Sequence, residues 1–457
     1  MEFPKIYPVR PVSKALKGQV ICLPGSKSLT NRALIMAALC PGVVTLEGAL
    51  FSRDTELMLA ALRQLKFLVK TDPIRSRIVI EGQGGHITEA KASLHVGNAG
   101  TVARFLTAFL CLRKGGIYEL DGDSAMRERP MKGLLDALSN CGAASVYYHG
   151  KEGHFPFTLK THGLKGGAME VDAQASSQIL SALLMVAPLA AKSSVLHCSN
   201  TRKPFVAMTL ALMRDVFGLE PCSPLENDEG YNISNDFAYQ SPHQAKVLIE
   251  PDITAASYFA ALPIVAGGSL LLQNLATPSL QGDEAFLTLL ESQGLLEQQI
   301  ESEGRHVSAG SSRQGISADF SAFSDTFLTL AAIAPLLDSS VRIMGIGHTR
   351  HQETDRIAGM AKELKKLLGA DKVIEEATAL TLHPNLDSLK QRAQAALDRG
   401  TPLCIETYED HRFAMSFAVL GSYDLLGNGE PWLHIHNPGC CTKTFPQFFT
   451  VLEGLHG

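Results

Sequence analysis

Two kinds of helical segment alternate along the chain. Six segments open with a short polar cluster and continue as a run rich in Ala, Leu and Met; they start at Pro24, Gly97, Ala173, Pro251, Ser321 and Tyr408. Six others place apolar residues at i, i+3, i+4 and i+7; they start at Ser52, Arg129, Lys203, Gly282, Glu353 and Lys443. A run that is apolar on all sides predicts a buried helix, whereas the second pattern predicts an amphipathic helix with one solvated face.

The two series repeat in phase. Successive starts of the first series are separated by 73, 76, 78, 70 and 87 residues. Strand-like segments lie between the paired helices, and they read VVTLEGAL, GIYELDG, SSVLHCS, GSLLLQNL, SSVRIMGI and WLHIHN. Alternating segments such as LKFLVKTDPIRSRIVIEG predict a hairpin that closes each unit. We therefore expect an α/β (α+β) fold of six βαβαββ repeats; chance spacing in an ordinary α/β protein is the alternative.

Length and the repeat together predict two domains. The 457 residues exceed the size, roughly 250–300 residues, at which a single core stops growing. Three repeats make a domain of ordinary size, and a polar stretch, SPLENDEGYNISND, ends just before the fourth repeat. We expect the boundary near residues 245–250.

Composition narrows the class of function. Lys and Arg number 41 against 46 Asp and Glu, so the net charge is −5, which argues against a general nucleic-acid binder but not against a local basic pocket. No apolar run approaches the roughly 18–20 residues that span a membrane, and the first residues contain no apolar signal core. The nine cysteines are scattered without a C-x-x-C pair, which predicts a reduced, cytoplasmic protein.

Polar clusters at the starts of the buried helices are the candidate site. A helix N-terminus presents unpaired N–H groups and the positive end of its dipole, so it attracts anions. Helix capping alone would also explain Ser, Asn and Asp at these positions. It does not explain the cations Lys27, Arg32, Arg129, Arg356, Arg412 and Lys443, which oppose the dipole unless an anion accompanies them. Arg would hold a carboxylate with two hydrogen bonds, and Lys acts as a point charge on a phosphate, so the pattern predicts an anion site.

Two other kinds of site have weaker support. The segment Gly25–Ser28 resembles a Walker A loop but lacks the first glycine of that motif. His348 and His351 could bind a metal ion, but no third ligand stands at a helpful spacing. We expect no metal.

Long motifs in fixed order identify a family resemblance. They are PGSKSLTNRALIMAA, GNAGTVARFL, RERPMKGLLDAL, ASSQILSALLM, DITAASYF, ETDRIAGMAKEL, EDHRFAMSF and CTKTFP. With them the chain resembles the enolpyruvyl transferases over nearly its whole length. The resemblance implies two domains of three βαβαββ repeats with buried helices. It places residues 22–248 in the first, on the shikimate-phosphate side, and residues 1–21 with 249–457 in the second.

The resemblance also implies a reaction and its residues. The branch that the chain resembles most transfers the enolpyruvyl group of phosphoenolpyruvate to the 5-hydroxyl of shikimate 3-phosphate, as a monomer and without a cofactor. The implied catalytic residues are Asp325 as general base, Glu353 as proton donor, and Lys27. The implied phosphoenolpyruvate contacts are Lys27, Asn98, Gly100, Thr101, Arg129, Gln178, Arg356, Arg412 and Lys443. The implied shikimate 3-phosphate contacts are Lys27, Ser28, Arg32, Ser176, Ser177, Gln178, Arg202, Asp325, His348 and Gln352.

The departures from the family pattern lie mainly on the acceptor side. Arg202, Phe205, His348 and Gln352 stand where Ser, Tyr, Asn and Lys are usual, and Phe105 replaces a Pro, which leaves sensitivity to glyphosate open. The segment DGDSAMRERP has no cysteine, which argues against the branch that acts on UDP-N-acetylglucosamine. Two alternatives remain: a transferase for another phosphorylated cyclitol or sugar, and a catalytically silent anion-binding repeat protein. The presence of Asp325 and Glu353 argues against the second.

Overall fold

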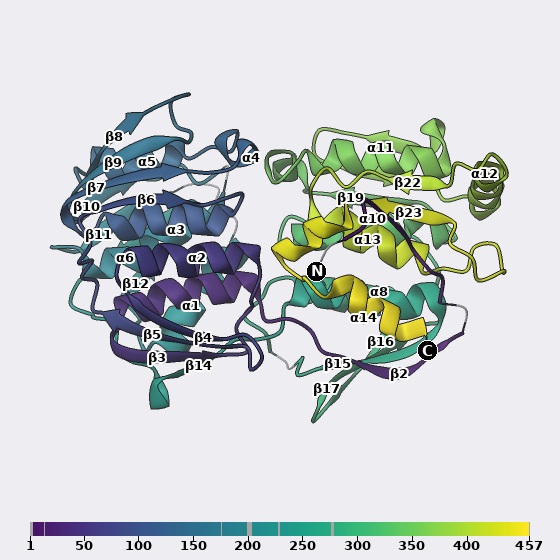
Figure 1. Ribbon diagram of the computed structural model, residues 1–457, viewed down its shortest axis with the longest axis horizontal. Coiled ribbons are helices and arrows are strands. Elements are labelled where there is room, and N and C mark those ends of the chain that lie inside the picture. Colours follow the sequence, from purple (N-terminus) through teal and green to yellow (C-terminus); the bar gives the residue numbers. More distant parts are fainter. Residues whose placement is uncertain are drawn as a thin grey trace. The chain divides into compact units, whose positions relative to one another are not determined.

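A computed structural model describes residues 3–12, 14–174, 176–198, 203–226, 229–275 and 278–456. The chain divides into two compact units (Figure 1). One, which we call the inserted unit, is Gly25–Glu250; the other, the terminal unit, joins Met1–Pro24 to Pro251–Gly457. The backbone passes between the units just beyond strands β2 (Leu16–Ile21) and β14 (Lys246–Leu248).

The inserted unit contains three βαβαββ repeats. The first comprises β14, α1 (Lys27–Leu39), β3 (Pro41–Glu47), α2 (Arg53–Gln64), β4 (Leu68–Asp72) and β5 (Arg77–Gln83). The second comprises β6 (Lys91–His95), α3 (Gly100–Leu110), β7 (Lys114–Asp121), α5 (Lys132–Asn140), β8 (Ala144–Tyr148) and β9 (Phe157–His162), with the short α4 (Ser124–Arg127) before α5. The third comprises β10 (Gly167–Glu170), α6 (Ser177–Val186), β11 (Ser194–His197), α7 (Lys203–Ala211), β12 (Cys222–Pro224) and β13 (Gly230–Ile233).

Each repeat of the inserted unit forms one four-stranded sheet with the same topology. The orders are β14-β3-β5-β4, β6-β7-β9-β8 and β10-β11-β13-β12. The first two strands in each order are parallel, and in the second and third repeats a buried helix connects them. The closing hairpin adds two antiparallel strands. The first repeat takes its parallel edge strand, β14, from the end of the unit.

The terminal unit contains two complete repeats and one shortened repeat. The first comprises β2, α8 (Ile253–Ala266), β15 (Gly268–Gln273), α9 (Glu284–Ser292), β16 (Leu296–Glu301) and β17 (Gly304–Ala309). The second comprises β18 (Ser317–Asp319), α10 (Phe327–Ile333), β19 (Val341–Met344), α11 (Arg356–Leu368), β20 (Val373–Glu375) and β21 (Leu380–Leu382). The third comprises β22 (Leu403–Ile405), α13 (His411–Gly421), β23 (Leu433–His436) and α14 (Phe448–Glu453).

The last repeat departs from the predicted plan. No closing hairpin follows α14 among the described residues; instead β1 (Ile6–Pro8) pairs antiparallel with β23, so this sheet has three strands in the order β1-β23-β22. An additional helix, α12 (Leu386–Asp398), precedes β22 and accounts for the longest of the repeat spacings. The helix predicted from Lys443 also starts later, at Phe448. Pro446 lacks a backbone N–H donor and disfavours helical geometry in Phe445, which delays the start.

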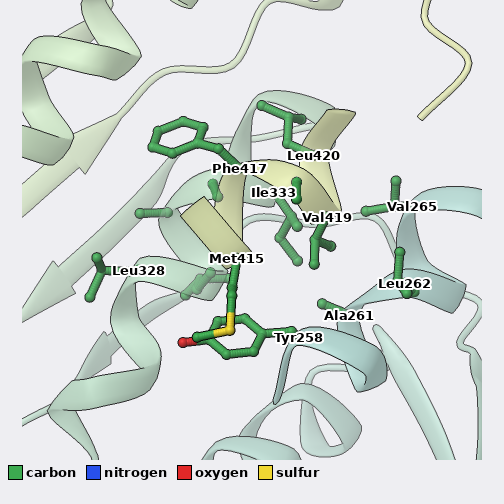
Figure 2. Packing of buried hydrophobic residues seen from close by; sticks show 14 of the residues in the cluster. Tyr258, Ala261, Leu262, Val265, Leu328, Ile333, Met415, Phe417, Val419 and Leu420 are labelled. Carbon is green, nitrogen blue, oxygen red and sulfur yellow. The ribbon is translucent and has the colours of Figure 1, made fainter. Parts of the chain in front are cut away.

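The buried helices form the cores, as the pattern predicts. Every residue of α3 and of α13 is buried, including polar ones such as Thr107 and Ser416. In the terminal unit, α8, α10 and α13 pack against one another (Figure 2), through residues that include Tyr258, Ala261, Leu262, Val265, Leu328, Ile333, Met415, Phe417, Val419 and Leu420. Burial of this apolar surface, worth about 25 cal/mol per Å², holds the starts of these helices in place.

Two further observations concern the whole chain. Across the described ranges, no helix combines the length and apolar character needed to cross a membrane. Cys40, Cys111, Cys198 and Cys441 are buried, whereas Cys22 is exposed.

Candidate active site

The predicted polar clusters of the inserted unit lie at the starts of its three buried helices. Helix α1 begins at Lys27, and the Ser26 side chain accepts a hydrogen bond from the N–H of Leu29 at 3.4 Å. Helix α3 begins at Gly100, and α6 begins at Ser177 with Ser176 as its cap. Capping therefore explains Ser26 and Ser176, but it leaves the neighbouring Lys and Arg residues to be explained by other contacts.

Gly100 and three other predicted ligand-binding residues come together in the inserted unit. A methyl group on Gly100 would lie 2.8 Å from Arg129 Nη2 and 2.8 Å from Gln178 Oε1, so only glycine leaves these side chains in place. Arg129 Nη1 also donates to the backbone and side-chain oxygens of Asn98, each at 3.3 Å. Residues from the second and third repeats thus share one polar locus.

Arg104 joins the loops of this locus, and sequence reasoning missed it. Its guanidinium donates to the Gly100 carbonyl at 3.2 Å, to Gln178 Oε1 at 3.3 Å and to the Pro130 carbonyl at 2.8 Å. Arg104 belongs to α3, and its side chain is buried. A signal was present, because an Arg within an otherwise apolar helix needs several acceptors.

Lys27 forms an ion pair that the sequence did not indicate. Its Nζ lies 3.4 Å from Oδ2 of Asp54, whose side chain is 3% exposed. Asp54 stands in the first turn of α2, where an acidic residue is expected for its interaction with the helix dipole alone. The pair fixes Lys27 at the start of α1.

Arg32 is a buried cation. Its side chain donates to Thr209 Oγ1 at 2.7 Å and to the carbonyls of Ser28 and Phe205 at 3.0 and 3.2 Å, and its guanidinium lies 5.2 Å from the centre of the Phe105 ring. Burial lowers the pKa of Arg32 to about 9, so it remains charged at neutral pH. No ion pair joins Arg32 to a carboxylate in the described ranges. Arg202, predicted nearby, lies outside the described residues.

Arg356 is the centre of the polar cluster in the terminal unit. It is the first residue of α11, and its side chain is 2% exposed. Its guanidinium pairs with Asp325 at 3.0 Å, Glu353 at 2.9 Å and Asp410 at 2.7 Å. Burial lowers the pKa of Arg356, but these three carboxylates outweigh burial and raise it overall. The guanidinium is therefore permanently charged.

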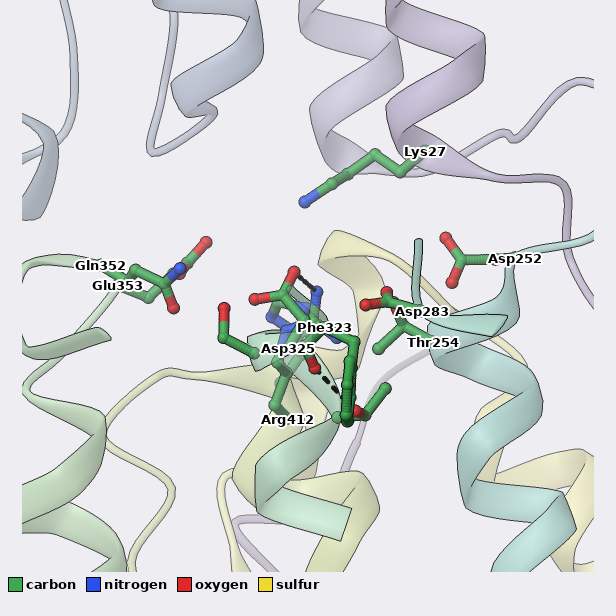
Figure 3. A network of polar contacts seen from close by, with 12 residues as sticks. Lys27, Asp252, Thr254, Asp283, Phe323, Asp325, Gln352, Glu353 and Arg412 are labelled. Atoms are coloured by element: carbon green, nitrogen blue, oxygen red, sulfur yellow. Dashed lines mark hydrogen bonds and ion pairs between the residues drawn. The ribbon is translucent and has the colours of Figure 1, made fainter. Parts of the chain in front are cut away.

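Each predicted catalytic carboxylate lies between two cations. Arg412 Nη2 is 2.6 Å from Asp325 Oδ2, and Lys443 Nζ is 2.7 Å from Glu353 Oε1. Figure 3 shows Asp325 and Arg412 directed toward each other, with Glu353 to one side. In the terminal unit the predicted cations Arg356, Arg412 and Lys443 are thus accompanied by the protein's own carboxylates, whereas the sequence pattern pointed to an anionic ligand alone.

His348 and Gln352 hydrogen-bond within this cluster. His348 Nε2 lies 2.8 Å from Ser324 Oγ, next to Asp325 in the chain. The Gln352 side-chain oxygen accepts from Arg356. His348 thus contacts the residue before Asp325 in the chain, and Gln352 contacts an arginine that pairs with Asp325.

Asp283 is a further buried carboxylate that sequence reasoning missed. It accepts a hydrogen bond from Thr254, and Figure 3 shows the pair on the opposite side of Asp325 from Glu353. Burial and the nearby charge of Asp325 raise the pKa of Asp283 to about 7. In the sequence Asp283 reads as an ordinary polar residue at the start of α9, so only the three-dimensional packing reveals its position.

Comparisons with known proteins agree on one family. The model of the family described as EPSP synthase (3-phosphoshikimate 1-carboxyvinyltransferase) matches residues 11–452. The chain is 46% identical to a 3-phosphoshikimate 1-carboxyvinyltransferase of Opitutus terrae, over 100% of this chain and 98% of that protein. It is 40% identical to the protein of the same name from Nostoc sp., over 94% of each chain.

Solved structures share the fold. The EPSP synthase of Acinetobacter baumannii superposes with a TM-score of 0.75 at 22% identity, covering 99% of this chain and 98% of that one. The enolpyruvyl transferase NikO of Streptomyces tendae gives 0.68 at 13% identity, covering 98% and 97%. These likenesses confirm the predicted fold class.

Proposed function

The chain belongs to the EPSP synthase family, and on this premise we propose that it transfers the enolpyruvyl group of phosphoenolpyruvate to the 5-hydroxyl of shikimate 3-phosphate and releases phosphate. Phosphoenolpyruvate carries a phosphate and a carboxylate, the two groups for which the helix starts provide Lys and Arg side chains. The reaction belongs to the shikimate pathway and to the synthesis of aromatic amino acids.

The donor is bound, in this proposal, by residues of both units. Lys27, Arg129 and Gln178 with the N–H groups of Gly100 and Thr101 hold the phosphate, since N–H groups at a helix start favour an anion. Asn98 orients Arg129. This role is supported by the two hydrogen bonds that Arg129 Nη1 donates to the backbone and side-chain oxygens of Asn98. Arg356, Arg412 and Lys443 hold the carboxylate end of the donor.

The acceptor is bound through its phosphate and its ring hydroxyls. Ser176, Ser177 and Gln178 at the start of α6 bind the phosphate together with Ser28, Arg32 and Arg202. The buried charge of Arg32 supports this assignment, because among the described residues its guanidinium bonds neutral oxygens, and an anionic ligand would offset the cost of burying the charge. Asp325, His348 and Gln352 contact the ring hydroxyls.

Asp325 and Glu353 move the protons in this proposal. Their ion pairs with Arg356, Arg412 and Lys443 stabilise the ionised carboxylates before the donor binds. The anionic groups of phosphoenolpyruvate then compete for the same cations, which frees Asp325 to act as a base and lets Glu353 take up a proton from solvent. Asp325 accepts the proton of the 5-hydroxyl, this oxygen attacks C2 of the donor, and protonated Glu353 gives its proton to C3. In the elimination the C3 proton returns to Glu353, the C2–O bond to phosphate breaks, and the proton on Asp325 passes to the leaving phosphate, which leaves the enolpyruvyl ether.

One observation carries this assignment of roles: the interleaving of two carboxylates with three cations at the helix starts of a single cluster. Electrostatic groups fixed in advance are the main requirement of such a reaction, because charge develops on the donor as it adds and leaves. A surface with only helix-capping roles would not need buried Arg residues shared between carboxylates.

A phosphate-release assay tests the proposed function. Purified protein is mixed with phosphoenolpyruvate and either shikimate 3-phosphate or a panel of other phosphorylated cyclitols and sugars. We expect phosphate release with shikimate 3-phosphate and none with phosphoenolpyruvate alone. Release with another alcohol only would favour a paralogous acceptor, which the residues at positions 202, 205, 348 and 352 would then explain. No release with any acceptor would favour a silent anion-binding protein.

We also propose that the enzyme works as a monomer in the cytoplasm. The nine cysteines are scattered along the chain without a C-x-x-C pair, which fits a reducing compartment. The steps proposed above use protein side chains alone.

A further inference from the structure

The segment before α13 has an unfavourable backbone conformation. Tyr408 and Glu409 have φ values of 53° and 56°, in the left-handed region that residues with a side chain rarely adopt. The next residue, Asp410, is the N-cap of α13 and the partner of Arg356. Two consecutive residues in this region persist only where surrounding contacts hold them.

A buried glutamate provides such contacts. Glu363 of α11 is 0% exposed and accepts a hydrogen bond from the Tyr408 hydroxyl at 2.6 Å. Its other carboxylate oxygen accepts from the backbone N–H of Glu406 at 3.0 Å and from Lys366. One carboxylate therefore binds the segment on both sides of Thr407.

The Tyr408 ring is also packed directly against α11. It makes an edge-to-face contact with Phe413, with ring centres 5.4 Å apart. A methyl group on Gly359 would lie 2.7 Å from the Phe413 ring and 3.4 Å from the Tyr408 ring, so both rings rest on the helix backbone there. The aromatic packing and the hydrogen bond fix Tyr408 together.

Helix α11 thus contacts this segment at two points. Arg356 at its start pairs with Asp410, and Glu363 two turns later binds Tyr408. Asp410 also accepts the backbone N–H of Arg412 at 3.0 Å. A movement of the segment would therefore shift Asp410, the Arg356 guanidinium that it binds and the backbone of Arg412.

We propose that Tyr408 and Glu363 are positioning residues for phosphoenolpyruvate: their hydrogen bond holds the left-handed segment so that Asp410 keeps the Arg356 guanidinium and the backbone of Arg412 in place for binding the donor's carboxylate. The inference rests on the proposed function, in which these two arginines bind the donor. Neither Tyr408 nor Glu363 touches substrate in this account.

Steady-state kinetics of Tyr408→Phe test the proposal. The variant keeps the ring packing and loses only the hydroxyl, so we expect KM for phosphoenolpyruvate to rise about tenfold, as for a lost hydrogen bond to a charged group, while KM for shikimate 3-phosphate changes by less than about twofold. Glu363→Gln should act in the same direction. Tyr118→Phe is the matched control, because it removes a hydroxyl that donates to the Glu89 carbonyl at 2.8 Å in the inserted unit.

A second substitution separates positioning from loss of stability. Asn adopts the left-handed region more readily than Glu, and Glu409 is exposed, so Glu409→Asn should restore most of the donor KM in the Tyr408→Phe background. A structural role alone would lower the thermal midpoint without a selective change in the donor KM. That result would overturn the positioning role and leave the proposed function standing. An unchanged KM for phosphoenolpyruvate in Tyr408→Phe, with an active wild type, would do the same. An inactive wild type would overturn the proposed function and this inference with it.

Discussion

Asp325 and Glu353 occupy similar electrostatic positions, and their different roles must come from what each one faces when ligands are bound. Arg356 pairs with both carboxylates, Arg412 pairs with Asp325, and Lys443 pairs with Glu353. Because the arginine is shared, a ligand that engages Arg356 alters the environment of both groups at once. Two carboxyl groups with opposed roles require different surroundings, and the bound ligands would have to supply that difference.

Removing either carboxylate should abolish most of the activity. We expect Asp325→Ala and Glu353→Gln each to lower kcat by about 10²–10⁴-fold, the usual contribution of a general acid or base. Phosphate release measures kcat, and circular dichroism checks that each variant folds. Asp338→Asn, at an exposed carboxylate, is the control and should retain activity. Full activity in both variants would contradict the assigned roles.

Gly100→Ala should weaken binding of the donor. The new methyl group would approach the polar ends of Arg104, Arg129 and Gln178 to 2.8 Å, and these flexible ends must move to accommodate it. We expect KM for phosphoenolpyruvate to rise about tenfold or more, with a loss of stability of about 1–3 kcal/mol from overpacking. Kinetics with each substrate varied in turn measure the effect. A rise confined to KM for shikimate 3-phosphate would show that this locus serves the acceptor instead.

Asp283 should make stability depend on pH. Its pKa is raised to about 7 in the folded protein, so between the unfolded pKa and 7 the folded state keeps a proton that the unfolded state has lost. Stability therefore falls as pH rises through this window. Asp283→Asn removes the titration and can still accept from Thr254, so its advantage over wild type should grow by about 2 kcal/mol between pH 5 and pH 8. Thermal unfolding at both pH values tests this, and a constant difference would contradict it.

The residues that sequence reasoning found and missed differ in a simple way. Lys27, Arg129, Arg356 and Arg412 stand out because cations at helix starts oppose the dipole. The signal at Arg104 is only that of an Arg inside an apolar helix, and Asp283 looks like an ordinary cap. Their partners are Gln178, from the next repeat, and Thr254, from another helix of the same repeat, and no local pattern reveals either contact.

At the scale of the elements, the N-cap residue fixes where a helix starts and therefore where the charged side chain in its first turn stands. Asp355 is the N-cap of α11 and accepts from the N–H of Ala358 at 3.0 Å, immediately before Arg356. It also pairs with Arg350 at 2.8 Å on a partly exposed surface. The bond to the Ala358 N–H sets the start of the helix, whereas the ion pair with Arg350 contributes little to the free energy of unfolding.

Substitutions at Asp355 separate these contacts. We expect Asp355→Ala to lower the free energy of unfolding by about 1 kcal/mol, and Asp355→Asn, which keeps a capping oxygen, by less than half as much. Thermal unfolding measures both. An equal loss in the two variants would assign the effect to the ion pair with Arg350.

Most elements could be predicted from periodicity, and the exceptions have physical reasons. The strands WLHIHN and VVTLEGAL appear as β23 and β3, and the all-round apolar runs are the buried helices. The pairing of β1 with β23 could not be predicted, because it joins the two ends of the terminal unit and leaves no local pattern. Helix α12 is amphipathic but falls outside the two series, so it was not expected.

At the scale of the whole molecule, the terminal unit depends on strands from both sides of the inserted unit in the sequence. Strand β2 pairs in parallel with β15, so the first residues of the chain complete a sheet whose remaining strands come after residue 250. The repeat spacing predicted six units, but it did not predict that the first residues of the chain join the second domain. The family resemblance implied this crossover.

The central claim is that side chains from both units bind one phosphoenolpyruvate. A crystal structure of the Glu353→Gln variant, grown with shikimate 3-phosphate and phosphoenolpyruvate, tests it most directly because the variant should stall before the donor is consumed. The account predicts hydrogen bonds or ion pairs from Lys27 and Arg129 to the phosphate and from Arg356 and Arg412 to the carboxylate of the same molecule. Donor density contacted by only one of these pairs, with the other pair turned to solvent, would contradict it.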